Sequence, residues 1–215
     1  MLLAIDTSAG TSVSIVDNGK SAASGNPSAR VLATAESADP RAHAEVLDGL
    51  IASVLSEAGI SPKQLTGVVA GMGPGPFTGL RVGIAAARVF AFGAGVPVIP
   101  VVSHDAIAFG IGGPTLVVTD ARRREVYWSA YSGTDEAGLP VREHGPALCK
   151  PAELAASVAN FERFERMDAA TVPATNLGLL AAALLAHDRP LATGGALYLR
   201  SPDVTISAGP KRVTS

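Results

Sequence analysis

The fold of this chain is decided by the stretch Gly71-Met72-Gly73-Pro74-Gly75-Pro76-Phe77-Thr78-Gly79-Leu80-Arg81-Val82-Gly83. It follows a short apolar run, Leu65 to Ala70, and leads into a helix-like sequence. α/β proteins often hold phosphates in such a strand–loop–helix order, because N–H groups at a helix start point into the loop. Here Pro74 and Pro76 have no N–H to donate, and no Gly-Lys-Ser/Thr follows. The pattern therefore argues against a P-loop and matches a dinucleotide-binding fingerprint only weakly.

Small residues recur at every fourth position of the helix-like sequence after this loop. They are Gly79, Gly83, Ala87, Ala91 and Gly95. Residues four apart lie on one helix face, so another helix can approach this stripe closely. The remaining positions are mostly apolar, which is typical of a helix that is buried on every side. One of those sides could be covered by a second subunit, and the alternative is a central helix inside one domain.

The segment Gly-Pro-Gly-Pro-Phe-Thr-Gly-Leu-Arg-Val-Gly closely resembles the signature of the TsaB (YeaZ) family. Three further segments match in the same order along the chain. They are Leu3 to Ser8 near the start, Val117 to Trp128 in the middle and Leu197 to Arg200 near the end. The resemblance implies an α/β, actin-like (ASKHA, ribonuclease H-like) two-lobed fold, with mixed sheets flanked by helices.

The resemblance also implies a function. TsaB proteins are non-catalytic scaffolding subunits that pair with the related catalytic subunit TsaD. Together they help to make N6-threonylcarbamoyladenosine (t6A) at position 37, beside the anticodon of tRNAs that read codons starting with A. By this resemblance we expect a TsaD-type subunit and a TsaE-type ATPase as partners, a homodimer when the chain is alone, and only indirect contact with tRNA. We expect no catalytic residue, metal or cofactor, and no activity of the chain alone.

Two other classes of protein stay open. One is an actin-like enzyme that acts on its own, such as a nucleotide-dependent kinase or phosphatase, or a peptidase. The other is an autonomous homodimeric binding module. The prolines of the glycine loop and the broken histidine pair described below favour the scaffolding subunit over the enzyme.

Charge and composition narrow these classes further. The formal net charge is −2, from 17 basic and 19 acidic residues. Proteins that bind an RNA backbone unaided usually carry a basic excess or a basic stripe. Here only two short runs are basic, Arg122-Arg123-Arg124 and Lys211-Arg212. Tight binding of tRNA by this chain alone is therefore not expected.

Cysteine usage and apolar runs indicate a cytoplasmic protein without a membrane segment. Cys149 is the single cysteine, so it cannot form an internal disulfide. The first residues lack the basic region of a signal peptide. The longest apolar run, Leu177 to Ala186, is half as long as a membrane span.

The pattern along the chain predicts two domains. Apolar and alternating runs predict strands over 2–5, 12–16 and 31–36, with a hairpin turn at Asn18-Gly19. Asp39 and Pro40 are typical of a helix start, and Gly59 of its end. We expect an N-terminal actin-like domain over 1–102, which carries the interface helices. A smaller, abbreviated C-terminal domain over 103–215 would begin with a strand pair at 115–120 and 125–132.

The two helices at 47–58 and 79–91 are the expected interface with a partner or a second copy, because both carry apolar or small-residue stripes. The candidate interface residues are His43, Leu47, Leu50, Val54, Gly79, Gly83, Ala87 and Ala91.

Asp6, Thr7 and Ser8 follow the first strand, where actin-like ATPases position an acid near the metal of the nucleotide. They could be a vestigial nucleotide loop. Alternatively, Thr7 and Ser8 are turn residues whose hydroxyls bond to nearby backbone, and this second interpretation is favoured because only one glycine, Gly10, follows them.

Other polar residues are weaker candidates for a site. The residue four positions after His43 is Leu47, so the histidine pair that TsaD carries in the corresponding helix is broken, and we expect local hydrogen bonding or an interface role for His43. Asp120 and Glu125 flank three arginines and are expected to form ion pairs. His104 and Asp105 are adjacent, so their side chains diverge and cannot form a catalytic dyad.

Overall fold

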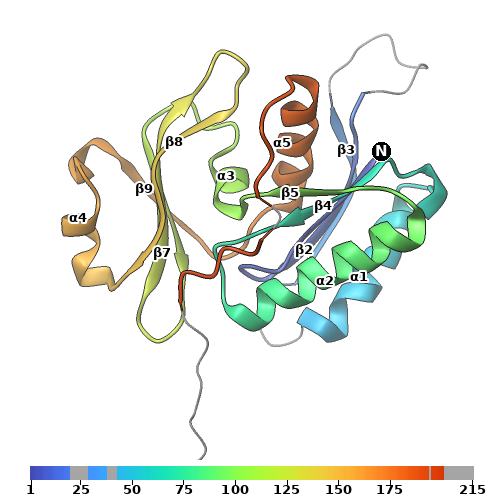
Figure 1. Cartoon of the computed structure of the whole chain (residues 1–215), viewed down its shortest axis with the longest axis horizontal. Helices are drawn as coiled ribbons and strands as arrows, with labels where there is room; N and C mark the ends of the chain where they lie inside the picture. Colours follow the sequence, from blue (N-terminus) through green and yellow to red (C-terminus); the bar gives the residue numbers. More distant parts are fainter. Residues whose placement is uncertain (20–28, 38–42, 194, 201–215) are drawn as a thin grey trace, which may run out of the picture.

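The computed structural model of the chain describes residues 1–19, 29–37, 43–193 and 195–200. It contains two β-sheets, each forming one lobe, with the first sheet between helices (Figure 1). The first sheet has the order β3-β2-β1-β4-β5. Its strands are β1 Leu2–Asp6, β2 Thr11–Asp17, β3 Arg30–Ser37, β4 Gly67–Gly71 and β5 Val98–Val101.

This first sheet is mixed. β2 pairs antiparallel with β1 and β3, whereas β4 runs parallel to β1 and β5. The predicted opening meander is therefore confirmed. All five residues of β1 are buried, as expected for a strand covered on both faces.

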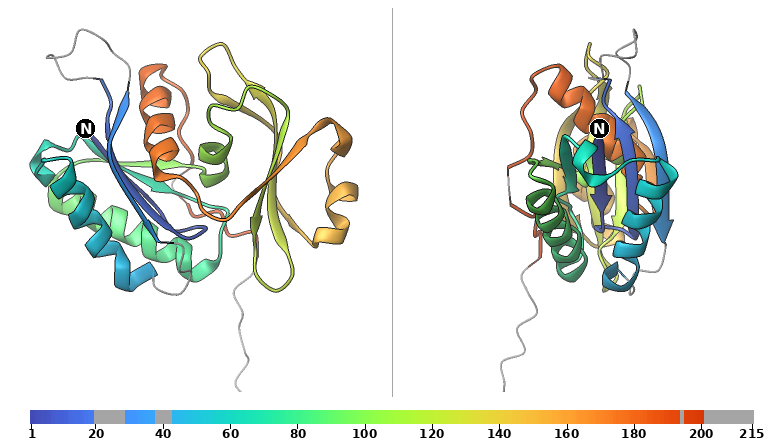
Figure 2. Two further views of the ribbon diagram at one scale, coloured as in Figure 1. Left: turned by 180° about the vertical axis from the view of Figure 1, so that it is seen from behind. Right: turned by 90° about the vertical axis from the view of Figure 1, so that its right-hand side faces the viewer.

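Helices cover the two faces of the first sheet. α1 (His43–Glu57) and α2 (Phe77–Ala94) lie on one face and α5 (Ala174–Ala186) on the other, as the view from behind in Figure 2 shows. Successive residues of β1 alternate between the two cores, because side chains of a strand point to opposite faces. Leu3 and Ile5 join the core under α1 and α2, and Leu2 and Ala4 join the core under α5.

The helix boundaries follow local signals. α2 ends where Gly95 adopts a left-handed conformation, with φ of 70°, and its N–H bonds to the carbonyls of Ala91 and Phe92. α1 is described from His43, so the predicted helix start at Asp39 and Pro40 lies outside the described residues. By length and composition alone α2 could span a membrane, but Leu80, Ile84 and Ala87 pack it into the core of the first lobe.

The second sheet has the order β8-β7-β6-β9. Its strands are β6 Thr115–Asp120, β7 Val126–Thr134, β8 Pro140–Cys149 and β9 Glu165–Ala169. The predicted pair, β6 and β7, is confirmed as antiparallel. After β8 come a 3-10 turn, Pro151–Glu153, and the short helix α4, Leu154–Ser157. Another 3-10 turn, Phe161–Arg163, precedes β9, and one more, Pro62–Gln64, precedes β4.

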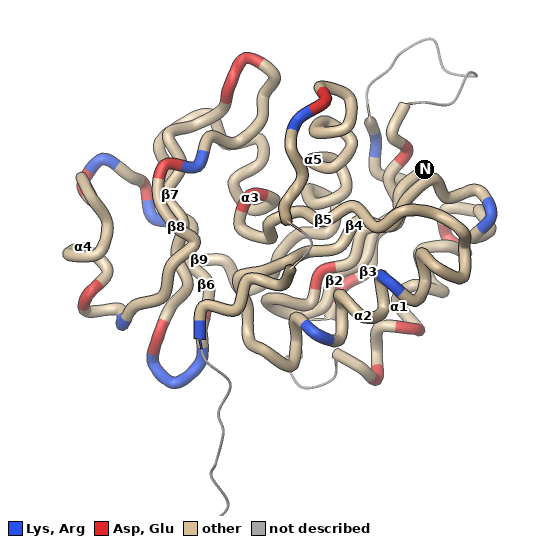
Figure 3. The backbone as a smooth tube through the Cα atoms, in the orientation of Figure 1, with Lys and Arg blue, Asp and Glu red and all other residues tan. Residues whose placement is uncertain are grey.

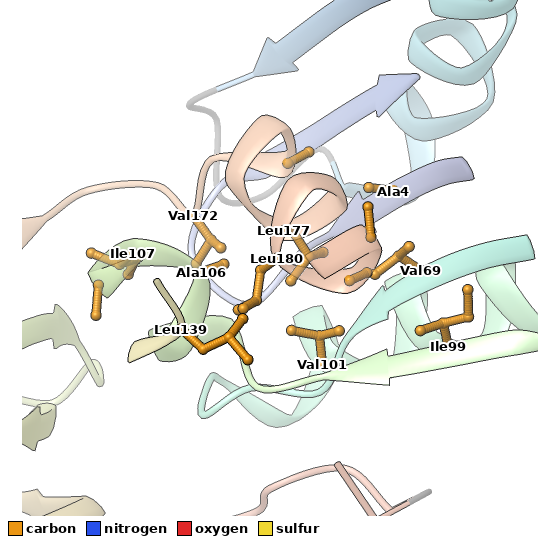
Figure 4. Close-up of a cluster of buried hydrophobic side chains, with 14 of the residues drawn as sticks. Ala4, Val69, Ile99, Val101, Ala106, Ile107, Leu139, Val172, Leu177 and Leu180 are labelled. Atoms are coloured by element: carbon orange, nitrogen blue, oxygen red, sulfur yellow. The ribbon is translucent and has the colours of Figure 1, made fainter. Parts of the chain in front are cut away.

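One hydrophobic core connects the two lobes. Figure 4 shows Ala106 and Ile107, from α3 (Ser103–Ala108), facing the same cluster as Leu177 and Leu180 of α5. Leu139, directly before β8 of the second sheet, packs against the same cluster. Each buried Leu or Ile side chain of this cluster contributes on the order of 2 kcal/mol. The lobes are therefore packed against each other.

The division into domains 1–102 and 103–215 stays a prediction. The two sheets do lie on either side of this point in the sequence. Helix α5 follows the second sheet in the chain, yet it packs on β1 and β2 of the first one. The C-terminal segment thus returns to the first lobe.

Candidate functional site

Asp6, at the end of β1, is fully buried and holds three segments together. One carboxylate oxygen accepts hydrogen bonds from the backbone N–H and the hydroxyl of Ser8, at 2.7 and 2.6 Å. The other accepts from the hydroxyl of Ser103 at 2.5 Å, and that hydroxyl accepts from the N–H of Gly73 at 2.9 Å. Burial raises the pKa of Asp6, while these hydrogen bonds act in the opposite direction. The carboxylate is therefore committed to contacts within the chain.

The side chain of Thr7 is likewise engaged in hydrogen bonds within the chain. Its hydroxyl donates to the carbonyl of Gly79 at 2.7 Å and accepts from the N–H of Gly83 at 3.0 Å. A Cβ added at Gly83 would collide with the Thr7 side chain, and one added at Gly79 would lie 2.6 Å from the Thr7 carbonyl oxygen. The glycines of α2 therefore let the turn after β1 approach the helix.

This contact shows what covers the small-residue stripe within the chain. Gly79, Gly83, Ala87 and Ala91 all face the core of their own lobe and are buried there. On α1, Leu47 and Val54 are likewise buried, with 3% and 0% of their surface exposed. These six residues are covered by the chain itself, and their place at an interface with a partner stays a prediction. Spacing identified a close-packed face but not what covers it.

The outward face of α2 carries exposed apolar side chains. Val89 and Phe92 of α2 are 72% and 90% exposed. Ala85 is exposed on the same face, because positions 85, 89 and 92 follow helical spacing. On the neighbouring α1, Leu50 is half-buried and packs against the core of the first lobe. Among the predicted interface residues, only His43 and Leu50 have accessible side chains.

His43 begins α1 and has a local partner. Its Nδ1 lies 2.6 Å from the hydroxyl of Thr11, at the start of β2. It also lines a hollow of about 350 Å³ with Thr78, Val82 and Arg122. This agrees with the expected local hydrogen bond. Within the described residues, no three His, Cys, Asp or Glu side chains are grouped as a metal site would require.

His104 and Asp105 have different partners, as their adjacency predicts. The two ring nitrogens of His104 lie 2.8 Å from the Ser129 hydroxyl and 2.9 Å from the Thr119 hydroxyl. Asp105 accepts a hydrogen bond from the Tyr131 hydroxyl at 2.7 Å and pairs with Arg142 at 3.3 Å. This buried network fastens α3 to the second sheet.

Burial sets the protonation of this network. Desolvation, and secondarily the charge of Arg142, lowers the pKa of His104 to about 3, so its imidazole is neutral at physiological pH. Desolvation raises the pKa of Asp105, against the opposing effect of Arg142. A neutral histidine with both nitrogens bonded serves packing rather than proton transfer.

A cleft of about 410 Å³ lies between the two lobes. The first lobe contributes the glycine–proline loop and the first residues of α2, and the second contributes the turn between β6 and β7. The segment after α5 closes one side with Tyr198 and Arg200. Neither of these last two residues was predicted to belong to a site, although the segment Leu197 to Arg200 was part of the family resemblance.

Three arginines form the turn on the second lobe. Arg122, Arg123 and Arg124 all have positive φ, at 63°, 53° and 62°. Such conformations are uncommon for residues with a side chain and are often found at functional sites. Arg122 pairs with Asp120 at 3.6 Å, and Glu125 pairs with Arg200. The expected ion pairs are therefore present, with Arg200 as a partner that the sequence did not indicate.

Comparison with known proteins identifies the family to which the chain belongs. The family model described as "TsaD: tRNA N6-adenosine threonylcarbamoyltransferase" matches residues 33–187. The tRNA threonylcarbamoyladenosine biosynthesis protein TsaB of Escherichia coli K12 is 37% identical over 117 residues, which are 52% of this chain and 50% of that protein. The chain belongs to the TsaB/YeaZ family. TsaB of Haemophilus influenzae is 39% identical over 94 residues, 41% of this chain and 40% of that protein.

Solved structures of the TsaB/YeaZ family share the fold. A protein of Pseudomonas aeruginosa, described as similar to peptidase YEAZ, superposes with a TM-score of 0.72 and 27% identity, over 93% of this chain and 99% of that one. YeaZ of Pseudomonas aeruginosa superposes with a TM-score of 0.69 and 27% identity, over 86% of this chain and 92% of that one. The two lobes are therefore an actin-like (ASKHA) fold, as the sequence resemblance implied. In sequence, the chain spans about half the length of the curated TsaB relatives it matches.

Proposed function

We propose that this TsaB/YeaZ-family chain is a non-catalytic scaffolding subunit in the biosynthesis of t6A in tRNA. The names of its relatives give the pathway, because two of them are tRNA threonylcarbamoyladenosine biosynthesis proteins. The proposal includes a TsaD-type catalytic partner, a TsaE-type ATPase, a homodimer in the absence of the partner, and a cytoplasmic location without membrane attachment.

The hydrogen bonds of the turn after β1 support the proposal that the chain is non-catalytic. In actin-like ATPases this turn positions an acid near the metal of the nucleotide. Here Asp6 and Thr7 are engaged by Ser8, Ser103 and the backbone of α2. A nucleotide could reach them only if these bonds broke. This favours the scaffolding subunit over the alternative, an actin-like enzyme or peptidase acting on its own.

The exposed apolar side chains of α2 support a protein partner. Large exposed side chains such as Phe92 gain stability when another surface covers them, so a contiguous apolar face is a typical interaction site. We place the contact with a TsaD-type subunit, or with a second copy of the chain, on Leu50, Ala85, Val89 and Phe92.

Reconstitution tests the proposal. The purified chain and the TsaD-type subunit of the same organism are combined with TsaE-type ATPase, threonylcarbamoyl-adenylate and unmodified tRNA, and t6A is measured by mass spectrometry. Modification should require both subunits, and the chain alone should hydrolyse no ATP above background. An ATP turnover by the chain alone that Asp6→Ala abolishes would instead support the independent enzyme.

A further inference from the structure

The cleft between the lobes has the dimensions and chemistry of a ligand site. Its volume of about 410 Å³ lies within the range of small-molecule pockets. A second hollow of about 350 Å³ adjoins it, and Pro76, Thr78 and Arg122 line both. The two together form a groove across the beginning of α2, from Tyr198 at one end to His43 at the other.

The charge around the cleft is positive, although the chain as a whole carries −2. Arg122, Arg123 and Arg200 line it, and Asp120 and Glu125 each pair with one arginine there. In Figure 3 the turn between β6 and β7 is blue, the colour of Lys and Arg, and it lies at the same end of the molecule as the beginning of α2. Three arginines thus line the place where the two lobes and a helix start meet.

An aromatic pair lies beside these arginines. The rings of Phe77 and Tyr198 are 4.9 Å apart between centroids, and the guanidinium of Arg81 lies 3.7 Å from the centre of the Phe77 ring. Tyr198 remains 42% exposed. Aromatic faces beside arginines are the means by which proteins hold unpaired nucleotides, with bases stacked and phosphates paired.

We propose that this groove binds single-stranded RNA, with a base against Tyr198 and adjacent phosphates on Arg122 and Arg123. The proposal rests on the proposed function, which supplies the tRNA, and it replaces the expectation that the chain touches tRNA only indirectly. The few basic groups of the groove give weak binding alone, so the contact serves to position an RNA that the partner also holds.

Binding is measured by fluorescence anisotropy with the full chain and a labelled anticodon stem-loop RNA. Tyr198→Ala should weaken binding about tenfold because the base loses its stacking surface, whereas Tyr198→Phe keeps the ring and should bind as the wild type does. The double variant Arg122→Ala/Arg123→Ala should reduce the slope of log affinity against log salt by about 0.7 for each phosphate that the protein no longer neutralises.

Arg189→Ala is the matched control, because Arg189 pairs with Asp135 outside the groove. It should leave both affinity and salt slope unchanged. Circular dichroism confirms that each variant is folded. Equal losses in the groove variants and in Arg189→Ala, or no loss in the groove variants, would overturn the proposal.

Competition separates RNA from other ligands. Unlabelled oligouridylate should displace the stem-loop, and AMP should do so only at far higher concentration. Displacement by AMP as effective as by RNA would overturn the proposal in favour of a free nucleotide, and displacement by an acidic peptide but not by oligouridylate would do so in favour of a protein ligand. These assays contain no TsaD-type subunit, so their failure is distinguishable from failure of the reconstituted modification.

Discussion

The hydroxyl of Thr7 accepts a hydrogen bond from the backbone N–H of Gly83 at 3.0 Å, which joins the turn after β1 to the middle of α2. This single contact explains two patterns in the sequence. Glycine is required at position 83 of α2, because a Cβ there would collide with the Thr7 side chain. Thr7, in turn, is engaged by α2 and is not free to bind a phosphate.

Replacement of Gly83 by alanine should destabilise the isolated chain. The added methyl group would press against Thr7, and overpacking of this kind costs about 1 to 3 kcal/mol of unfolding free energy. Gly93 of the same helix is the control, because an added Cβ there meets none of the described atoms within 4 Å. Gly93→Ala should stabilise the helix by up to about 1 kcal/mol. Urea denaturation measures both, and equal stability of the two variants would contradict the packing described.

Stability should decrease as the solution becomes acidic because of His104. Its pKa is about 3 in the folded chain and the usual 6.5 in the unfolded one, so as the pH falls below about 6.5 the unfolded chain takes up a proton that the folded chain does not bind. The stability from neutral His104 is therefore complete above pH 6.5 and is lost as pH falls. At pH 5 the loss from this group is about 2 kcal/mol.

Denaturation at pH 7.5 and pH 5 compares wild type with two variants. His104→Gln should lower stability at pH 7.5, because it disturbs the bonds to Ser129 and Thr119. The same change should reduce the further loss at pH 5. His187→Gln, at the exposed end of α5, retains His104 and should retain the full loss. The same pH response in both variants would show that His104 is not the source.

Phe92→Glu should weaken association of the chain with itself and with a TsaD-type subunit. A charge placed on an exposed apolar face does not affect the monomer core but must be desolvated when a partner covers it. We expect a loss of more than about tenfold in affinity, or 1.4 kcal/mol. Leu50→Glu on α1 should act in the same direction.

Val141→Glu is the control for this surface change, because Val141 is 39% exposed on β8 of the other lobe. Sedimentation velocity and titration with the partner measure the affinities. Normal association of folded Phe92→Glu would place the interface elsewhere, and an equal loss in Val141→Glu would show a nonspecific effect of charge.

Local patterns were sufficient to predict part of this fold. The apolar run of β1 and the alternating run of β2 have strand periodicity, and the spacing of Gly79 and Gly83 indicated a close approach. The spacing could not tell which surface would approach, and within the chain this surface is the turn that contains Thr7. β9 was missed because it is an edge strand with the polar, mostly exposed sequence Glu165–Ala169.

The cleft was beyond what the sequence could predict. Tyr198 and Phe77 are far apart in the chain and meet only because the segment after α5 returns to the first lobe. The positive φ angles of the three arginines likewise depend on the tight turn between β6 and β7. The family resemblance identified both segments as informative without showing that they face the same cleft.

The central claim, a role in t6A formation through a catalytic partner, is tested most directly in the cell. The chain is depleted, and the ratio of t6A to adenosine is measured by mass spectrometry in purified tRNAs that read codons starting with A. We predict that the ratio falls while tRNA abundance is unchanged, and that wild type restores it but Phe92→Glu does not. A normal t6A ratio after complete depletion would contradict the account.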